Sequence, residues 1–196
     1  MVLTLSTFST DLVSRYGVIG VALAMTLESA GIPIPSEVVM PLAGFVSRSP
    51  AGLATMIAAG LAGNLVGSWI GYGIGHGVGQ SGHKPRAWLA KRHWEKAQQW
   101  FAQHGNAAVL IGRVVPVIRT YISFPAGAAD MPLGRFTAYT ALGSVLWSAA
   151  LASLGYALGT RWQDIGPWFT RYTAITLTLV VVAGLVWVWR YRRSRA

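Results

Sequence analysis

The sequence predicts an all-α polytopic membrane protein, built as an inverted repeat of two re-entrant helical hairpins. Each hairpin is followed by a transmembrane helix, and one more transmembrane helix ends the chain. Three observations predict this fold. Of 196 residues, 53% are hydrophobic and 11% are charged, and that charged fraction is about half of what soluble domains carry. Several apolar stretches are short and contain prolines, and the two halves of the chain present the same elements in the same order.

Three charge-free runs are long enough to cross a bilayer, which takes about 20 apolar residues in a helix. They are Ser49–Gly82, Phe136–Thr160 and Tyr172–Trp189, the last with an arginine at each end. An arginine at the end of a span can extend its charge to the interface while its stem stays in lipid. We therefore expect one spanning helix at each of the three runs.

The other apolar stretches are shorter and form two pairs, each interrupted by proline. The stretches are 16–27 with 38–47, and 97–112 with 120–129. Pro33 and Pro35 lie at the centre of the first pair, and Pro116 and then Pro125 interrupt the second. Proline lacks a backbone donor and clashes with a continuing helix, so each pair is predicted to enter the bilayer, break and turn back.

An offset of 80 residues, as from Gly63 to Gly143, relates the two long helices that follow these pairs. Glycines recur at every fourth position in the first, and the same offset leads to related positions in the second: Gly63, Gly67, Gly71, Gly75 and Gly79, then Gly143, Trp147, Leu151, Gly155 and Gly159. Small residues at this spacing are typical of close helix packing in membranes, which we favour over a ligand-cradling role. The same ladder is compatible with a homodimer.

Two basic clusters set the expected orientation of a chain with a net charge of +10. The clusters lie in 84–96 and 190–195, and the positive-inside rule assigns both, and hence the C-terminus, to the cytoplasm. The two hairpins then open to opposite faces. We expect a single domain over 1–196, divided as follows: first repeat about 10–82, cytoplasmic amphipathic connector about 83–104, second repeat about 105–160, C-terminal helix and basic tail about 166–196.

Four charged residues bracket the proline breaks: Glu28 and Glu37 in the first half, Arg113 and Arg119 in the second. An ionised side chain at the centre of a membrane helix costs roughly 2.5–3.5 kcal/mol on insertion scales. One interpretation is that these residues pair across the hairpins and hold them together. The other is that the arginines bind an anionic headgroup, for which the guanidinium fork is suited, while the carboxylates take up and release protons.

Other classes of function find little support in the sequence. Outside the two basic clusters, no stripe of basic residues is interleaved with aromatic residues as in nucleic-acid-binding proteins, and the chain has no cysteine. The four histidines show neither metal-ligand spacing nor a paired carboxylate, and the serines lack the G-x-S-x-G elbow of hydrolases. We expect no metal, no cofactor and no catalytic residue. The N-terminus lacks the basic start of a signal peptide, so all residues are treated as mature.

Two motifs then resemble the DedA family of bacterial membrane proteins. The first is Glu28-Ser-Ala-Gly-Ile-Pro-Ile-Pro-Ser-Glu37, followed by Pro41-Leu-Ala-Gly-Phe45. The second is Gly112-Arg-Val-Val-Pro-Val-Ile-Arg-Thr120, followed by Phe124-Pro-Ala-Gly127, Met131-Pro132 and Gly143-Ser-Val-Leu-Trp147. The resemblance covers roughly residues 15–160. Asp130 departs from it, because a basic or neutral residue is expected there.

The resemblance implies a lipid transporter of the cytoplasmic membrane that depends on the proton gradient. It implies that Glu28 and Glu37 handle protons and that Arg113 and Arg119 bind the lipid phosphate. The compact Pro-Ile-Pro-Ser-Glu form resembles members that return undecaprenyl phosphate, the cell-wall carrier lipid, across the membrane. A flippase or scramblase for phosphatidylethanolamine or another phospholipid stays an alternative, as do a membrane enzyme acting on lipid phosphates and a structural or ion-conducting protein.

Overall fold

The computed structural model of the chain describes residues 2–32, 34–80, 107–115 and 118–159, and the regular structure in these ranges is helical. The helices are α1 (Val2–Ser29), α2 (Ser36–Val46), α3 (Pro50–Gln80), α5 (Ala107–Val114), α6 (Ile118–Tyr121), α7 (Ser123–Ala128) and α8 (Leu133–Leu158). The predicted connector, the C-terminal helix, Pro33 and Pro116 lie outside the described residues. An all-helical architecture is confirmed for the described part of the chain.

Three of these helices are long and apolar enough to cross a membrane: Asp11–Ser29, Pro50–Gln80 and Leu133–Leu158. The last two are the spanning helices predicted at 49–82 and 136–160. The first includes the short segment predicted at 16–27, together with residues before it. Arg15 and Glu28 bound the charge-free stretch 16–27, whereas α1 includes both residues.

Gly17 divides α1 into two parts. Its backbone leaves the helical region, with φ 50° and ψ −120°, a conformation that glycine adopts without a steric penalty. The chain then folds back, since a Cβ at Gly20 would overlap the backbone carbonyl of Leu12. The part of α1 after this bend corresponds to the predicted short segment and forms the first arm of a hairpin.

The prolines play different structural roles. Pro35 is the N-cap of α2 in an extended conformation, with φ −76° and ψ 97°, so it lies at the predicted break between α1 and α2. Pro125 follows the interruption between α6, which ends at Tyr121, and α7, which begins at Ser123. It lies inside α7 (Ser123–Ala128), in the first turn, where a helix has no use for a backbone N–H and tolerates proline.

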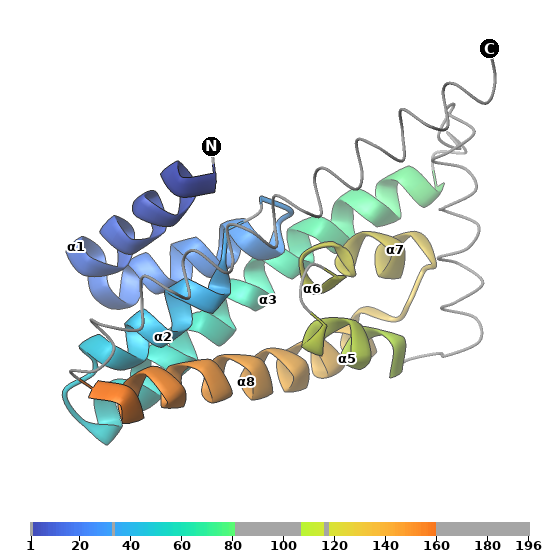
Figure 1. The fold of residues 1–196 in the computed structure, drawn as a ribbon. Helices are drawn as coiled ribbons and strands as arrows, with labels where there is room; N and C mark the ends of the chain where they lie inside the picture. The colour runs from blue at the N-terminus through green and yellow to red at the C-terminus, as the bar shows by residue number, and fades with distance from the viewer. Residues whose placement is uncertain (1, 33, 81–106, 116–117, 160–196) are drawn as a thin grey trace, which may run out of the picture.

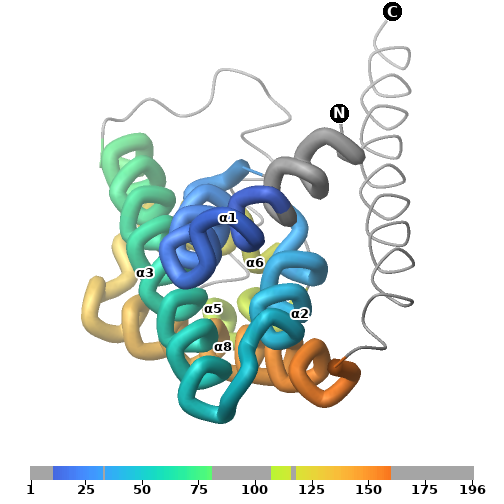
Figure 2. The backbone as a smooth tube through the Cα atoms, turned by 90° about the vertical axis from the view of Figure 1, so that its left-hand side faces the viewer, coloured from blue at the N-terminus to red at the C-terminus, as the bar shows by residue number. Residues whose placement is uncertain are grey.

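Two hairpins approach one another along the molecule. In Figure 1 the α1–α2 hairpin enters from one end and the α5–α6–α7 segment from the other, with α6 near the point where they meet. The long helices α3 and α8 run antiparallel to one another alongside them, and α8 lies along the lower edge of this view. In the end-on view of Figure 2, α5 and α6 project inside the outline formed by α1, α2, α3 and α8. The two tips therefore meet in the interior.

Each long helix packs against arms of both hairpins through glycine. A Cβ at Gly75 of α3 would overlap the backbone of Phe124 in α7, and a Cβ at Gly155 of α8 would overlap the backbone of Pro41 in α2. Gly75 corresponds to Gly155 by the offset that relates the two glycine ladders, and Pro41 corresponds to Phe124 by nearly the same offset. The same contact therefore occurs twice, once in each half of the chain.

The short helices α2 and α7 also contribute glycines to these contacts with α8 and α3. A Cβ at Gly127 of α7 would overlap the carbonyl of Tyr72 in α3, and one at Gly44 of α2 would overlap the carbonyl of Ala152 in α8. Both pairs again occupy corresponding positions in the two halves of the chain. The packing interpretation of the glycine ladder is confirmed at these crossings.

Alanine at Gly75 or Gly155 is expected to destabilise the protein by about 1–3 kcal/mol, the usual cost of an overpacked contact. Gly73 and Gly77, also in α3, are the matched controls, because a Cβ there meets nothing within 4 Å. Alanine at these controls should be neutral or slightly stabilising. Thermal unfolding of the purified variants in detergent measures the difference, and equal melting temperatures for both sets would contradict the packing argument.

Candidate functional site

The four charged residues singled out by the sequence come from both hairpins. Glu28 lies at the end of α1, Glu37 in the first turn of α2, Arg113 in the last turn of α5 and Arg119 in α6. Glu28, Arg113 and Arg119 are only 3%, 1% and 2% exposed, whereas Glu37 is half-buried. Three charges are thus enclosed where the hairpin tips meet.

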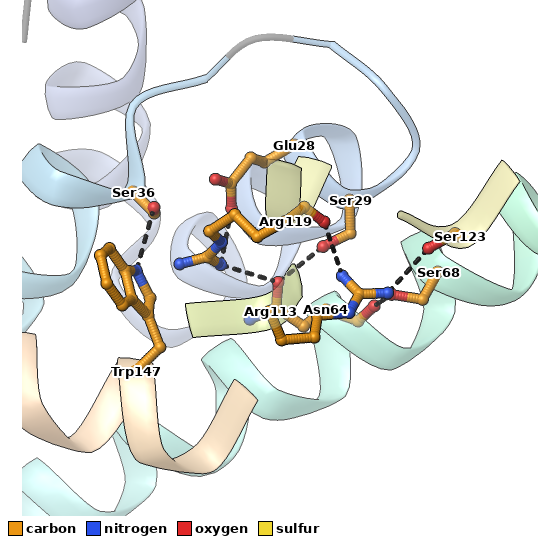
Figure 3. A network of polar contacts seen from close by, with 9 residues as sticks. All are labelled: Glu28, Ser29, Ser36, Asn64, Ser68, Arg113, Arg119, Ser123 and Trp147. Atoms are coloured by element: carbon orange, nitrogen blue, oxygen red, sulfur yellow. Dashed lines mark hydrogen bonds and ion pairs between the residues drawn. The ribbon is translucent and has the colours of Figure 1, made fainter. Parts of the chain in front are cut away.

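Glu28 and Arg119 form an ion pair across the two hairpins. Arg119 Nη2 lies 3.1 Å from Glu28 Oε2, and the same nitrogen donates to Asn64 Oδ1 of α3 at 3.3 Å. Asn64 Oδ1 also accepts a hydrogen bond from Ser29 at 2.6 Å. Figure 3 shows that this group joins α1, α3 and α6. Asn64 of α3 therefore binds Arg119 directly and binds Ser29, the residue next to Glu28.

Arg113 is bound by neutral oxygens. Its Nη2 donates to the hydroxyls of Ser68 and Ser123, both at 2.7 Å, and its Nη1 donates to the backbone carbonyl of Arg119 at 3.0 Å. Within the described ranges it makes no ion pair with a carboxylate. One guanidinium consequently connects α3, α5, α6 and α7 (Figure 3).

Aromatic rings of α8 cover both guanidinium groups. The Cζ of Arg119 lies 5.0 Å from the centre of the Trp147 ring, and that of Arg113 lies 6.0 Å from the Phe136 ring. Such contacts are favourable and become stronger when the cation is desolvated. Trp147 also donates to Ser36 at 3.4 Å, which ties α8 to the start of α2. The charged network is thus closed from the α8 side.

Glu37 contributes charge without a fixed partner among the described residues. It is close enough for its carboxylate to repel that of Glu28. Buried pairs of like charge are unfavourable unless protons or cations compensate them. Glu37 is half-buried and Glu28 is buried, so Glu37 is the more accessible of the two carboxylates.

Three nitrogens of this network have no hydrogen-bond partner within the described part of the chain: Arg119 Nη1, Arg113 Nε and Asn64 Nδ2. All three groups only donate hydrogen bonds. Leaving a buried donor unpaired costs about 1–3 kcal/mol, and more for a charged group. The site therefore has spare capacity for an acceptor-rich anion beside Arg119.

Sequence reasoning missed the polar residues of α3. Asn64 and Ser68 hold Arg119 and Arg113, and they are one helical turn apart. Asn64 is the only asparagine in the charge-free run 49–82, and polar residues inside a membrane span are commonly functional. That signal was present, although nothing in the sequence said which charges the two side chains would contact.

His76 has the paired carboxylate that the sequence did not indicate. Its Nδ1 lies 3.2 Å from Asp130 Oδ1, and its Nε2 lies 3.0 Å from the amide nitrogen of Gln80. His76 and Asp130 belong to different halves of the chain, so spacing could not reveal the pair. Among the described residues, no group of three or more His, Asp and Glu side chains could hold a metal ion.

Three helices able to cross a bilayer, enclosing a charged network, define a multi-pass membrane protein with a buried polar site. Comparison with protein-family models matches residues 34–157 to the VTT domain. The chain belongs to this family, the DedA family, as the two motifs indicated. No solved structure matches the chain significantly.

Named relatives cover nearly the whole chain. Undecaprenyl phosphate transporter A of Bacillus subtilis is 32% identical over 186 residues, which are 92% of this chain and 92% of the relative. Undecaprenyl phosphate transporter A of Staphylococcus aureus is 26% identical over 194 residues, 95% and 96% of the two chains. An alkaline phosphatase-like protein of Lactococcus lactis subsp. lactis is 33% identical over 187 residues, 91% and 86% of the two chains.

Proposed function

We propose that the protein is a flippase that translocates undecaprenyl phosphate across the bacterial cytoplasmic membrane. The observation that carries the proposal is the buried guanidinium of Arg119, which has one nitrogen on Glu28 and another without a partner among the described residues. Guanidinium groups match phosphate oxygens in geometry and charge. The names of the Bacillus and Staphylococcus relatives support this choice of lipid.

The phosphate would displace Glu28 from Arg119. Lipid phosphate and carboxylate compete for one guanidinium, so a displaced Glu28 loses its counter-charge inside an enclosed site. Taking up a proton removes the cost of that buried charge. Glu37, which is half-buried and near Glu28, is suited to pass the proton on. In this mechanism Arg113 contributes positive charge, and the isoprenoid tail stays in lipid throughout.

The proposed architecture is an inverted repeat of two re-entrant hairpins with the headgroup site where the tips meet. The duplicated glycine contacts support it, since each long helix packs against arms of both hairpins in equivalent ways. Binding sites at the interface of inverted repeats are typical of secondary transporters. Both basic clusters and the C-terminus face the cytoplasm in this arrangement, and a homodimer is compatible with it.

Transport in liposomes tests the proposal. Purified protein is reconstituted with undecaprenyl phosphate or with labelled phosphatidylethanolamine, and movement between leaflets is followed with and without a pH gradient. We expect faster movement of undecaprenyl phosphate, further increased by the gradient. Equal rates for both lipids would favour a general phospholipid flippase or scramblase, and no movement of either would refute transport. A rate of lipid movement that does not change with the pH gradient would contradict proton coupling.

Arg119→Ala is expected to reduce this transport by about a hundredfold, because truncating one partner of a buried charge contact costs about 2–5 kcal/mol. Arg135→Ala is the control, since Arg135 is exposed on α8. Unchanged transport in Arg119→Ala, measured at equal protein content per vesicle, would point instead to a structural role for the ion pair.

The name of the Lactococcus relative favours one other candidate, a membrane enzyme that removes phosphate from a lipid. The same liposomes distinguish the two functions when released inorganic phosphate is measured together with lipid movement. A flippase moves the lipid and leaves the phosphate ester intact. Phosphate release in step with lipid loss would support the enzyme and contradict the flippase.

A further inference from the structure

Three hydroxyl side chains of α8 lie buried on one face without a hydrogen-bond partner in the described part of the chain. They are Thr140, Ser144 and Ser148, which are 0%, 2% and 0% exposed. Residues four apart lie on the same side of a helix, so the three hydroxyl groups form a row, which we call the α8 hydroxyl row. The mechanism proposed above does not use it.

The absence of partners is unusual because each hydroxyl has a carbonyl within easy reach. Serine and threonine in helices commonly donate to the carbonyl four residues earlier. Four described residues of other helices or helix ends do so: Thr26, Ser47, Thr55 and Ser68. The α8 hydroxyl row does not use these carbonyls. Each unmet hydroxyl costs about 1–3 kcal/mol, which favours a role in binding over a role in folding.

The row faces α3 and the charged network. Ser148 Oγ lies 3.5 Å from the place that a Cβ on Gly60 would take. Because α3 and α8 are antiparallel (Figure 1), steps of four residues along each helix place Ser144 opposite Asn64 and Thr140 opposite Ser68. The row thus lies across from the two α3 side chains that hold the arginines.

Both guanidinium groups reach α8 beside the row. The stem of Arg113 lies against Gly143, where an added Cβ would lie 2.5 Å from the Cβ of Arg113, and its guanidinium lies over Phe136 at 6.0 Å. The guanidinium of Arg119 lies over Trp147 at 5.0 Å. Gly143 and Trp147 directly precede Ser144 and Ser148 in sequence. The three unpartnered nitrogens and the three unpartnered hydroxyls therefore belong to one polar seam between α3 and α8.

We infer that Thr140, Ser144 and Ser148, together with Asn64, bind phosphate oxygens of the lipid headgroup after it leaves Arg119. This inference rests on the proposed function. The seam offers amide, guanidinium and hydroxyl donors, so its complement is an acceptor-rich anion. A cation does not fit, because two guanidinium groups adjoin the seam. Neutral donors hold a phosphate more weakly than arginine, as a site along a path requires.

The row is closed in the conformation described here, since Thr140 and Ser148 are fully buried. Separation of α3 and α8 is needed to admit a headgroup. Internal equivalence gives the row a counterpart, since Ser144 and Ser148 correspond to Asn64 and Ser68 by the offset that relates the two glycine ladders. In this conformation Asn64 and Ser68 bind the arginines, whereas the hydroxyls of Ser144 and Ser148 have no partner among the described residues.

Binding of undecaprenyl phosphate to Ser144→Ala, Ser148→Ala and the double variant tests the inference. We expect each single change to weaken affinity by about tenfold, the equivalent of one hydrogen bond to a charged group. Melting temperatures should stay the same or rise, because each change removes an unmet polar group. Thr55→Val is the matched control, since Thr55 is exposed on α3 and its hydroxyl donates to Ala51.

Each other outcome overturns the inference in a recognisable way. Unchanged affinity in the serine variants, with binding lost in Arg119→Ala, would show that the α8 hydroxyl row does not bind the headgroup. The proposed flippase function would be unaffected. If the unmodified protein did not bind the lipid, both the role of the row and the proposed flippase function would be contradicted. A fall in melting temperature alongside affinity would assign the row to folding. Equal weakening for undecaprenol would place the effect on the tail, and competition by inorganic phosphate at lipid concentrations would assign the row to the free ion.

Discussion

Glu28→Ala is expected to lower the free energy of unfolding by about 3–5 kcal/mol, the range found when one partner of a buried ion pair is removed. Arg119 would then stay enclosed, with Asn64 as its only side-chain acceptor among the described residues. Transport should be lost as well, because no carboxylate would compete with the phosphate for Arg119. Chemical denaturation in detergent and the liposome assay measure the two effects separately.

The double variant Glu28→Ala with Arg119→Met separates folding from function. It removes both buried charges, so its stability is expected to recover most of what Glu28→Ala loses, while transport stays absent. Glu37→Ala is the control. Glu37 is half-buried and makes no ion pair within the described ranges, so this change should cost less than about 1 kcal/mol. Additive losses in the double variant would show that the pair does not couple the hairpins.

Arg113→Lys is expected to cost about 3 kcal/mol or more, although it keeps the charge, because hydrogen bonds from charged groups contribute about 1.5–3 kcal/mol each. The guanidinium reaches two hydroxyls and one carbonyl on three different segments, whereas an ammonium is a compact point charge without the planar fork. At least one of these hydrogen bonds would be lost together with the contact to Phe136.

The control for this prediction is Arg135→Lys on the exposed surface of α8. Its effect should lie within about 0.5 kcal/mol, as is usual for surface substitutions. Thermal and chemical unfolding of both variants compare the two sites directly. If Arg113→Lys were as stable as Arg135→Lys, charge alone would suffice at this position, and the hydrogen-bonded geometry would have no bearing on stability.

Arg113 and Arg119 have different roles in these predictions, although the sequence analysis treated them as a pair. Arg113 and Arg119 flank the same break, so both were expected to bind the phosphate. The structure gives Arg113 three protein acceptors and leaves only its Nε unmet within the described part of the chain, while Arg119 keeps a terminal nitrogen unpartnered. Arg119 is accordingly the better placed of the two to receive a ligand.

The helix pattern was accessible from the sequence where hydropathy alone decides it. The bounds of α3 and α8 lie within a few residues of the ends of the charge-free runs 49–82 and 136–160. For α1 the same criterion predicted only the part after the bend at Gly17, because it treats Arg15 and Glu28 as ends of a span. A carboxylate paired with a guanidinium from another hairpin is compatible with a buried helix, and sequence distance hides that partner.

Local sequence determined the membrane character of the chain, its family motifs and the four charged residues, because composition and short motifs act through neighbours along the chain. Only the tertiary structure decided which carboxylate meets which guanidinium, that Asn64 and Ser68 hold them, that Pro125 lies inside a helix and that His76 meets Asp130. The physical reason is that most of these contacts join segments far apart in sequence, and their geometry depends on glycine-mediated helix crossings that fix distance and direction together.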